Sequence, residues 1–174
     1  METLLHKTAR WVVDIVAVLY LAAFVIYGFT AQVRMSGQSM MPLIRSDDVV
    51  FVNRILYHFA PLGRFDVVAF YRDDEKANLK RVIGLPGETV QIRDGGIYID
   101  GVLLAEGEWG QAVSLSGVAA EPVKLGPDEY FVLGDNREGS EDSRFDSIGN
   151  VGRSQIIGKV WLRVYPFIDA GLIE

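Results

Sequence analysis

The chain begins with a long apolar stretch. Residues 15–33 contain no charged side chain, and Thr30 and Gln32, near the end, are the only strongly polar residues. Such a run is close to the roughly 20 helical residues needed to cross a hydrocarbon core of about 30 Å. Trp11 precedes the run, where an interfacial anchor would lie. We therefore predict one transmembrane helix over residues 11–33.

The charges around this stretch leave two questions open. Residues 1–10 are expected to form a cytoplasmic tail, in which Lys7 and Arg10 precede the apolar run. A cleaved signal peptide has the same order of charge and apolar core and remains an alternative, although such a core spans only about 7–15 residues. Because Arg34 follows the run, the distribution of cations does not fix the orientation by itself.

Beyond residue 34 the apolar residues fall into short β-rich runs separated by turn formers, which predicts strands. These strands are expected at residues 48–55, 65–72, 79–85, 88–93, 96–104, 129–135 and 155–166. Asp94-Gly95-Gly96 supplies the positive φ angles of a tight hairpin turn. Residues 106–127 are rich in Gly, Ser and Ala and predict a loop-rich excursion. The predicted fold class is mainly β, an antiparallel sheet or barrel-like domain over residues 34–174.

Composition narrows the function classes. With 174 residues, of which 49% are hydrophobic, the chain can form one domain with a core plus a membrane segment. The net charge of −6 gives no basic surface for nucleic acid. Cysteine is absent, which excludes disulfides, thiol nucleophiles and cysteine metal sites. We expect neither a cofactor nor a metal.

Two segments do not fit the strand pattern. The first is "MSGQSMMPLI", residues 35–44, which combines small polar residues with large apolar ones and suggests a polar group presented on an apolar surface. The second is residues 133–152, whose Asp, Asn, Arg and Ser side chains suit turn capping and the bracing of a neighbouring loop. A solvated surface loop is the alternative for the second segment. A calcium loop is another, although the regular ligand spacing of an EF-hand is missing.

If Ser39 is a nucleophile, a nearby base must accept its proton. His6 precedes the apolar run, and His58 lies in the apolar stretch "ILYHFAPL". A lysine is the remaining base, as in the Ser-Lys variants of the serine protease triad. Lys80 opens the apolar segment "KRVIGLPG", where loss of hydration can lower a lysine pKa by up to about 3–5. An outward-facing strand lysine is the alternative for Lys80, and a Ser-His-Asp site through His58 stays open.

Three segments together resemble a known family. "SGQSMMPL", "LKRVIGLPGE" and "GDNREGSEDSR", in this order behind an N-terminal apolar segment, resemble type I signal peptidases. These are membrane-bound serine proteases that remove signal peptides from exported proteins. The resemblance spans nearly the whole chain, and the short region between Lys80 and Gly134 is similar to the compact, single-anchor type. It implies a mostly antiparallel β domain whose apolar surface rests on the membrane.

The resemblance also implies roles for individual residues. Ser39 would be the nucleophile and Lys80 the neutral general base of a Ser-Lys dyad. The supporting residues would be Ser140, which hydrogen-bonds to the lysine, Asp142 and Arg144, which brace the site, and Asp135 and Asn136, which shape its loop. The backbone N–H of Ser39 would point at the developing oxyanion. Some members add a hydroxyl two residues before the nucleophile, where this chain has Gly37.

By the same resemblance, the partners are preprotein signal peptides with small residues at positions −3 and −1, and the lipid bilayer. The enzyme would sit in a bacterial plasma membrane with its catalytic domain on the extracytoplasmic side. Met40, Met41, Leu43 and Ile44, with residues 55–62, could form an apolar surface that dips toward lipid. Ordinary core packing is the alternative for these side chains.

Two other functions fit parts of the sequence. A self-cleaving Ser-Lys protease of the repressor type would use related chemistry on a related fold, but the apolar N-terminal segment argues against it. A membrane-tethered β domain that only binds a partner would need no reactive serine. Processing of a preprotein, with and without Ser39, separates these functions.

Overall fold

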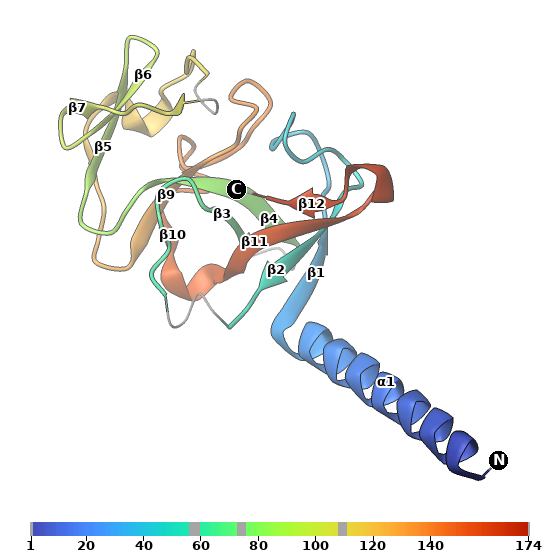
Figure 1. The fold of residues 1–174 in the computed structure, drawn as a ribbon. Coiled ribbons are helices and arrows are strands. Elements are labelled where there is room, and N and C mark those ends of the chain that lie inside the picture. The colour runs from blue at the N-terminus through green and yellow to red at the C-terminus, as the bar shows by residue number, and fades with distance from the viewer. Residues whose placement is uncertain (1, 56–59, 73–75, 108–110, 174) are drawn as a thin grey trace.

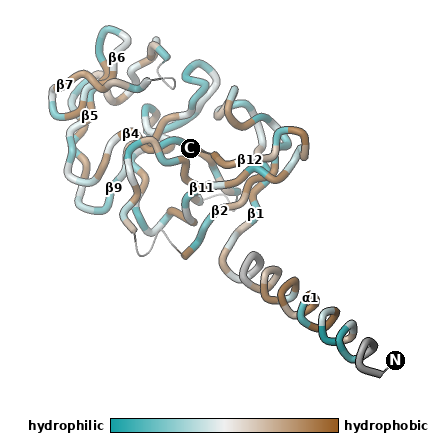
Figure 2. Tube along the Cα trace, in the orientation of Figure 1, coloured by the Kyte–Doolittle hydropathy of each residue, from teal (hydrophilic) through white to brown (hydrophobic). Residues whose placement is uncertain are grey.

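The structure is a computed structural model that describes residues 2–55, 60–72, 76–107 and 111–173. A 28-residue helix, α1 (Glu2–Phe29), projects from a β-rich body (Figure 1). Its large apolar side chains between Trp11 and Phe24 are exposed, and hydrophobic positions recur along this part of the helix (Figure 2). Among the described helices, none has the combined length and apolarity of a membrane span.

The helix predicted over residues 11–33 is wrong at its C-terminal end. α1 begins in the predicted tail and ends at Phe29, and Thr30–Arg34 form the strand β1. β1 pairs antiparallel with β2 (Val49–Asn53), and Val33 becomes buried in the core. Strand pairing with a distant segment therefore overrides the apolar pattern that suggested a continuous helix.

The larger sheet has eight strands, and its paired strands are antiparallel. Besides β1 and β2 it contains β3 (Val67–Tyr71), β4 (Ala77–Gly84), β9 (Glu129–Leu133), β10 (Val151–Gly152), β11 (Ile156–Tyr165) and β12 (Gly171–Leu172). The order is β1-β2-β11-β3-β4-β9-β10, and β12 pairs with β11. The antiparallel β class is confirmed, and β1 and β10 end the strand order without pairing to each other in the described chain.

A smaller sheet lies at the far side of the body from α1 (Figure 1). It contains β5 (Thr89–Arg93), β6 (Gly96–Ile99), β7 (Val102–Leu103) and β8 (Val123–Lys124), in the order β7-β6-β5-β8. The predicted hairpin is confirmed, because Asp94 and Gly95 have φ of 51° and 77° between β5 and β6. The predicted strand 96–104 is interrupted by a second turn, at Asp100 and Gly101.

The loop-rich excursion is confirmed between β7 and β9. Its described residues hold little regular structure besides β8 and the short 3-10 helix η2 (Gly117–Ala120). Two further 3-10 helices, η3 (Arg153–Gln155) and η4 (Phe167–Asp169), flank β11. The smaller sheet and the excursion bury one apolar cluster with residues of β4 and β9, so the two sheets share a core.

The segment around Ser39 packs on the larger sheet. Met40 and Ile44 are completely buried in an apolar cluster with β1, β2 and β3 residues. The prediction that these two side chains face lipid is therefore wrong, because they fill the core. The other predicted lipid-facing stretch has residues 56–59 outside the described residues, and its Leu62 is buried.

Candidate active site

Ser39 is presented by a turn that is fixed by its neighbours. β1 ends at Arg34, and the backbone of Met35 is hydrogen-bonded to Asp48 at 2.8 Å and to Asp47 at 2.9 Å. Met35 and Met40 on either side are buried, which fixes the turn, whereas Ser39 is half-buried. The mixture of apolar and small polar residues thus serves to anchor a turn that leaves one hydroxyl accessible.

Lys80 reaches this hydroxyl from the neighbouring strand. It lies in the middle of β4, is 4% exposed, and its Nζ is hydrogen-bonded to Ser39 Oγ at 2.9 Å. The alternative of an outward-facing lysine is therefore wrong. By contrast, Lys159 is half-exposed and paired with Asp66 at 2.6 Å, and Lys124 is exposed. His58 lies outside the described residues.

The environment of Lys80 favours the neutral amine. Burial is the main cause that lowers its pKa from 10.5 to about 8. The carboxylates of Asp142 and Glu141 act in the opposite direction, and the Arg144 guanidinium adds to the lowering. The amine can therefore accept a proton from Ser39 at mildly alkaline pH, and in part at neutral pH.

The loop after β9 carries the predicted supporting residues. Asp142 accepts hydrogen bonds from Arg144 Nε at 2.8 Å and Nη2 at 2.9 Å, and from the backbone N–H of Gly134 at 3.0 Å. Both side chains are buried, so the pair closes the loop on itself as the bracing role requires. Arg144 Nη2 also donates to the carbonyl of Arg137 at 2.8 Å.

Asp135 and Asn136 connect this loop to β4 and to the segment that carries Ser39. Asp135 pairs with both Nε and Nη2 of Arg81 at 2.8 Å, in a buried two-point contact. Arg81 follows Lys80 on β4 and faces the opposite side, because successive strand side chains alternate. The backbone N–H of Asn136 donates to the Ser39 carbonyl at 3.0 Å, and its side-chain amide donates to the Gln38 carbonyl at 3.1 Å.

Ser140 lies close to the Ser39 segment but does not hydrogen-bond to Lys80 as expected. Its hydroxyl is buried and has no hydrogen-bond partner among the described residues, so the implied bond to Lys80 is not formed. A Cβ added to Gly134 would collide with Ser140 Oγ and with the Ser39 carbonyl. Gly134 is thus the residue that lets these two groups come close.

Arg81, Arg137 and Gly134 contact the predicted site residues or their loop but were not predicted. Arg81 is a charged residue inside an apolar strand. Because a buried arginine is normally paired, this position indicates that a carboxylate partner should lie nearby. Arg137 and Gly134 stand inside the third motif. Glu106, the carboxylate that pairs with Arg137, lies in the excursion and carried no signal.

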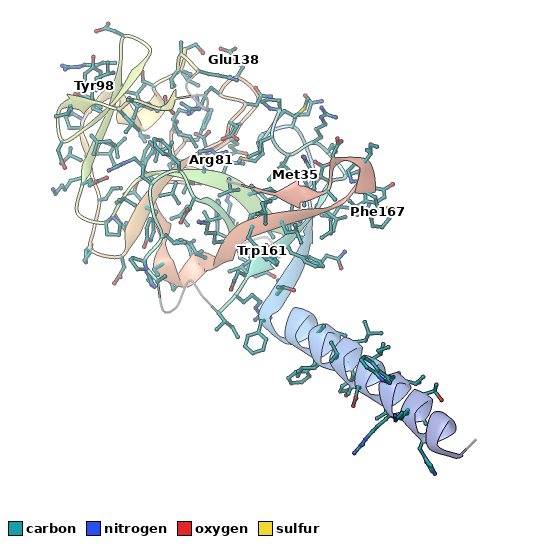
Figure 3. All side chains as sticks on the ribbon, viewed as in Figure 1. Met35, Arg81, Tyr98, Glu138, Trp161 and Phe167 are labelled. Carbon is teal, nitrogen blue, oxygen red and sulfur yellow. The ribbon has the colours of Figure 1, made fainter. Side chains whose placement is uncertain are left out.

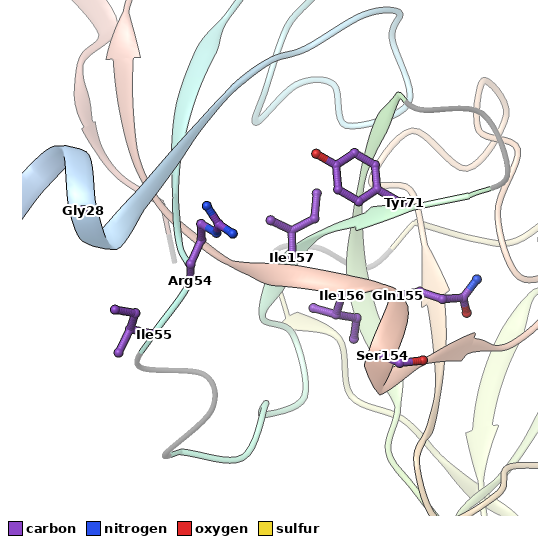
Figure 4. Close-up of a pocket in the computed structure, with 8 residues that line it drawn as sticks. All are labelled: Gly28, Arg54, Ile55, Tyr71, Ser154, Gln155, Ile156 and Ile157. Atoms are coloured by element: carbon purple, nitrogen blue, oxygen red, sulfur yellow. The ribbon is translucent and has the colours of Figure 1, made fainter.

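The structure also bears on a metal site, on the oxyanion and on cavities. In the described part of the chain, no cluster of three or more His, Cys, Asp or Glu side chains is arranged to hold a metal. Gly37 has φ of 94° and no side chain to donate to an oxyanion. A hollow of about 490 Å³ lies where α1 joins the sheet, lined by Arg54, Tyr71 and Ile157 among others (Figure 4), and it contains neither Ser39 nor Lys80.

Known proteins match this chain over most of its length. Residues 8–165 match the profile of the family described as "Signal peptidase, peptidase S26". Signal peptidase I of Bacillus caldolyticus is 33% identical, covering 90% of this chain and 89% of the relative. Signal peptidase I T of Bacillus subtilis is 34% identical, covering 91% and 86%.

A solved structure also matches. It is a signal peptidase I from Enterococcus faecalis with 34% identity, which covers 57% of this chain and 97% of that one at a TM-score of 0.49. The family profile covers far more than half of this chain, and the two Bacillus relatives each exceed 30% identity over nearly their whole length. The chain therefore belongs to the signal peptidase family, peptidase S26.

Proposed function

We propose that this protein is a serine endopeptidase that removes signal peptides from preproteins, with Ser39 as the nucleophile and Lys80 as the general base. The observation that carries the proposal is the 2.9 Å contact between Ser39 Oγ and a buried lysine whose pKa is lowered to about 8. A base must be neutral near the working pH and within hydrogen-bond reach of the proton that it takes. Lys80 meets both conditions.

The reaction follows from this pair. Neutral Lys80 takes the proton of Ser39 as Oγ attacks the scissile carbonyl, and the backbone N–H of Ser39 stabilises the oxyanion. The resulting ammonium gives its proton to the leaving amine, so that the peptide bond breaks and an acyl-enzyme remains. Lys80 then takes a proton from water, which attacks the ester, and the ammonium returns that proton to Ser39 Oγ as the carboxyl product leaves. The buried Ser140 hydroxyl has a free acceptor for the ammonium that forms during this cycle.

We propose that the substrates carry small residues at positions −3 and −1, as secretory signal peptides do. The nucleophile is only half-buried on a turn whose apolar neighbours are fixed in the core. A substrate backbone must therefore lie flat against this turn, and small side chains permit that approach. A cleavage site after a hydrophobic segment also requires that the enzyme work at the membrane surface.

For the membrane arrangement we propose that α1 is the anchor, with its N-terminal end in the cytoplasm and the β domain extracytoplasmic. The support is the row of exposed apolar side chains on α1.

A second apolar surface lies at the turn between β11 and β12, where Phe167 and Ile168 are 84% and 91% exposed (Figure 3). Arg163 donates to the carbonyls of Asp169 and Leu43 at 2.7 Å, so this turn is fixed beside the nucleophile segment. We infer that it contacts lipid.

Ser39→Ala in the full-length protein, assayed on a preprotein with an A-x-A site, tests the proposed function. Loss of the nucleophile in serine proteases can cost on the order of 10⁶ in rate, so we expect no measurable cleavage. Ser154→Ala, at an exposed serine on η3, is the matched control and should cleave normally. Cleavage by Ser39→Ala at a tenth of the wild-type rate would refute the assignment.

The same assay separates the two other functions. A protein that only binds a partner would leave the preprotein intact in the wild type as well. A self-cleaving protease would cut its own chain in a Ser39-dependent manner and leave the preprotein uncut.

A further inference from the structure

Arg137 forms a buried ion pair with a residue outside the three motifs. Its side chain is 1% exposed, and Nη2 donates to the carboxylate of Glu106, whose side chain is 9% exposed. Glu106 lies in the excursion that follows β7, 31 residues away in sequence. Arg137 Nε donates to the carbonyl of Gly134 at 3.0 Å. One guanidinium therefore connects the excursion to the first residue of the loop between β9 and β10, residues 134–150, which we call the catalytic loop.

The excursion touches the same loop at three further points. Ser114 Oγ donates to the Glu138 carboxylate at 2.7 Å, near the upper edge of the molecule in Figure 3. Arg144 Nη1 donates to the Leu115 carbonyl at 3.2 Å, and the backbone N–H of Val118 donates to the Arg144 carbonyl at 2.9 Å. The excursion thus lies along the loop from residue 137 to residue 144.

Of these contacts, loss of the Glu106–Arg137 ion pair should disturb the structure most. A buried guanidinium without its carboxylate is costly, so Arg137 would move toward water if Glu106 lost its charge. The Gly134 carbonyl, which Arg137 holds, would move with it. Gly134 packs against the Ser39 carbonyl and Ser140 Oγ, so the displacement reaches the nucleophile.

We propose that Glu106 is a positioning residue for the cleavage reaction, which acts through Arg137 to hold the catalytic loop against Ser39. The inference rests on the proposed function, because it assumes that Ser39 and Lys80 perform the chemistry. It assigns a role in the active site to the excursion of the smaller sheet. Among the described residues, Glu106 pairs with Arg137 and forms no hydrogen bond or ion pair with Ser39 or Lys80, so its effect must appear in their geometry.

The test compares Glu106→Gln with Glu121→Gln in the full-length protein. Glu121 is exposed in the same excursion and serves as the matched control. We expect Glu106→Gln to lower kcat at least tenfold with KM changed less than threefold, because a misplacement of about 1 Å can cost on the order of 10² in rate. Glu121→Gln should stay within twofold of wild type. A wild-type kcat for Glu106→Gln would overturn the inference.

The pH profile separates positioning from a loss of folded protein. A displaced loop admits water to Lys80, whose charged neighbours are Asp142, Glu141 and Arg144. Hydration favours the ammonium, so the acid limb of kcat/KM should move to higher pH in Glu106→Gln. A lower rate with an unmoved acid limb and a lower urea midpoint would mean that Glu106 only stabilises the fold.

A double-variant cycle tests the route through Arg137. If Glu106 acts through Arg137, adding Glu106→Gln to Arg137→Gln should lower kcat by less than twofold more, whereas independent effects would multiply. If Glu106→Gln does not fold, Glu106→Asp keeps the charge and shortens the side chain, and it should show the same shift to a smaller extent.

Activity in Ser39→Ala would refute the proposed function. Inactive Ser39 and Lys80 variants beside a fully active Glu106→Gln would refute this inference alone.

Discussion

Lys80 and Arg81 are adjacent basic residues on β4 that lie in different environments. Arg81 points to one side of the sheet and is neutralised by a two-point contact with Asp135. Lys80 points to the other side, where its hydrogen-bond partner is a neutral hydroxyl rather than a carboxylate. Burial without a directly bonded counter-charge disfavours the ammonium, which leaves Lys80 able to act as a base.

The depressed lysine pKa predicts how stability depends on pH. The folded pKa is about 8 and the unfolded one 10.5, so the unfolded chain binds the extra proton between these values. Keeping Lys80 buried therefore costs about 3 kcal/mol below pH 8, and this cost disappears as pH rises through the unfolded pKa.

Lys80→Met keeps the stem and removes the titrating group. By urea unfolding, it should be at least as stable as wild type at pH 7, with the difference shrinking from about pH 8 and nearly gone above about pH 10.5. Lys124→Met, at an exposed lysine, is the control and should show no such trend. A Lys80→Met protein that is strongly destabilised at pH 7 would mean that the ammonium stabilises the fold.

At this scale the sequence predicts some residues and not others. Ser39 and Lys80 are candidates because each is a polar residue in an apolar segment, and the resemblance to signal peptidases is what pairs them as nucleophile and base. That Ser140 forms no hydrogen bond to Lys80 could not be predicted, because this depends on how its rotatable hydroxyl lies against Gly134. The partner of Arg137 is equally unpredictable, since Glu106 is brought close only by the path of the excursion.

Among the structural elements, the turn after β9 is the one on which the site depends. Gly134→Ala would place a Cβ into Ser140 Oγ and the Ser39 carbonyl, so the nucleophile segment must move. We expect cleavage to fall by at least 10²-fold, in line with a displacement of about 1 Å. Gly171→Ala is the control, because nothing lies within 4 Å of its added Cβ. A normal cleavage rate for Gly134→Ala would show that the turn does not position Ser39.

The long strands were predictable because each carries several alternating apolar residues. β8, β10 and β12 have two residues each, which is too short for any period to be visible. β1 falls within the predicted helix because TAQV continues the apolar run and its pairing partner, β2, lies further along the chain. The local apolar pattern thus predicts a strand when that strand's own residues show the periodicity. It fails when pairing with a distant segment determines the secondary structure.

For the whole molecule, the absence of cysteine makes sidedness testable with single engineered thiols. His6→Cys lies on α1, and Val102→Cys lies on the exposed strand β7. A membrane-impermeant maleimide added to intact cells should label position 102 and leave position 6 unlabelled until the cells are opened. Labelling of position 6 alone would reverse the proposed orientation.

The same approach tests the proposed lipid contact. Ile168→Cys carrying an environment-sensitive fluorophore should be quenched by nitroxide-labelled phospholipid when the full-length protein is reconstituted in vesicles. Exposed apolar side chains of this kind contribute about 1.5–3 kcal/mol each when buried, which favours insertion of the turn. The label at Val102→Cys, on the smaller sheet, should not be quenched. Equal quenching at both positions, or at neither, would contradict a specific contact by the β11–β12 turn.

The claim that Lys80 activates Ser39 is tested most directly by the pH dependence of preprotein cleavage in wild type and in Lys80→Met. In the wild type, kcat/KM should rise with pH along an acid limb whose apparent pKa lies near 8, because the neutral amine is the active form. Lys80→Met should stay folded and cleave nothing at any pH. Cleavage by Lys80→Met at a tenth of the wild-type rate, at any pH, would contradict the account and return the search for the base to His58.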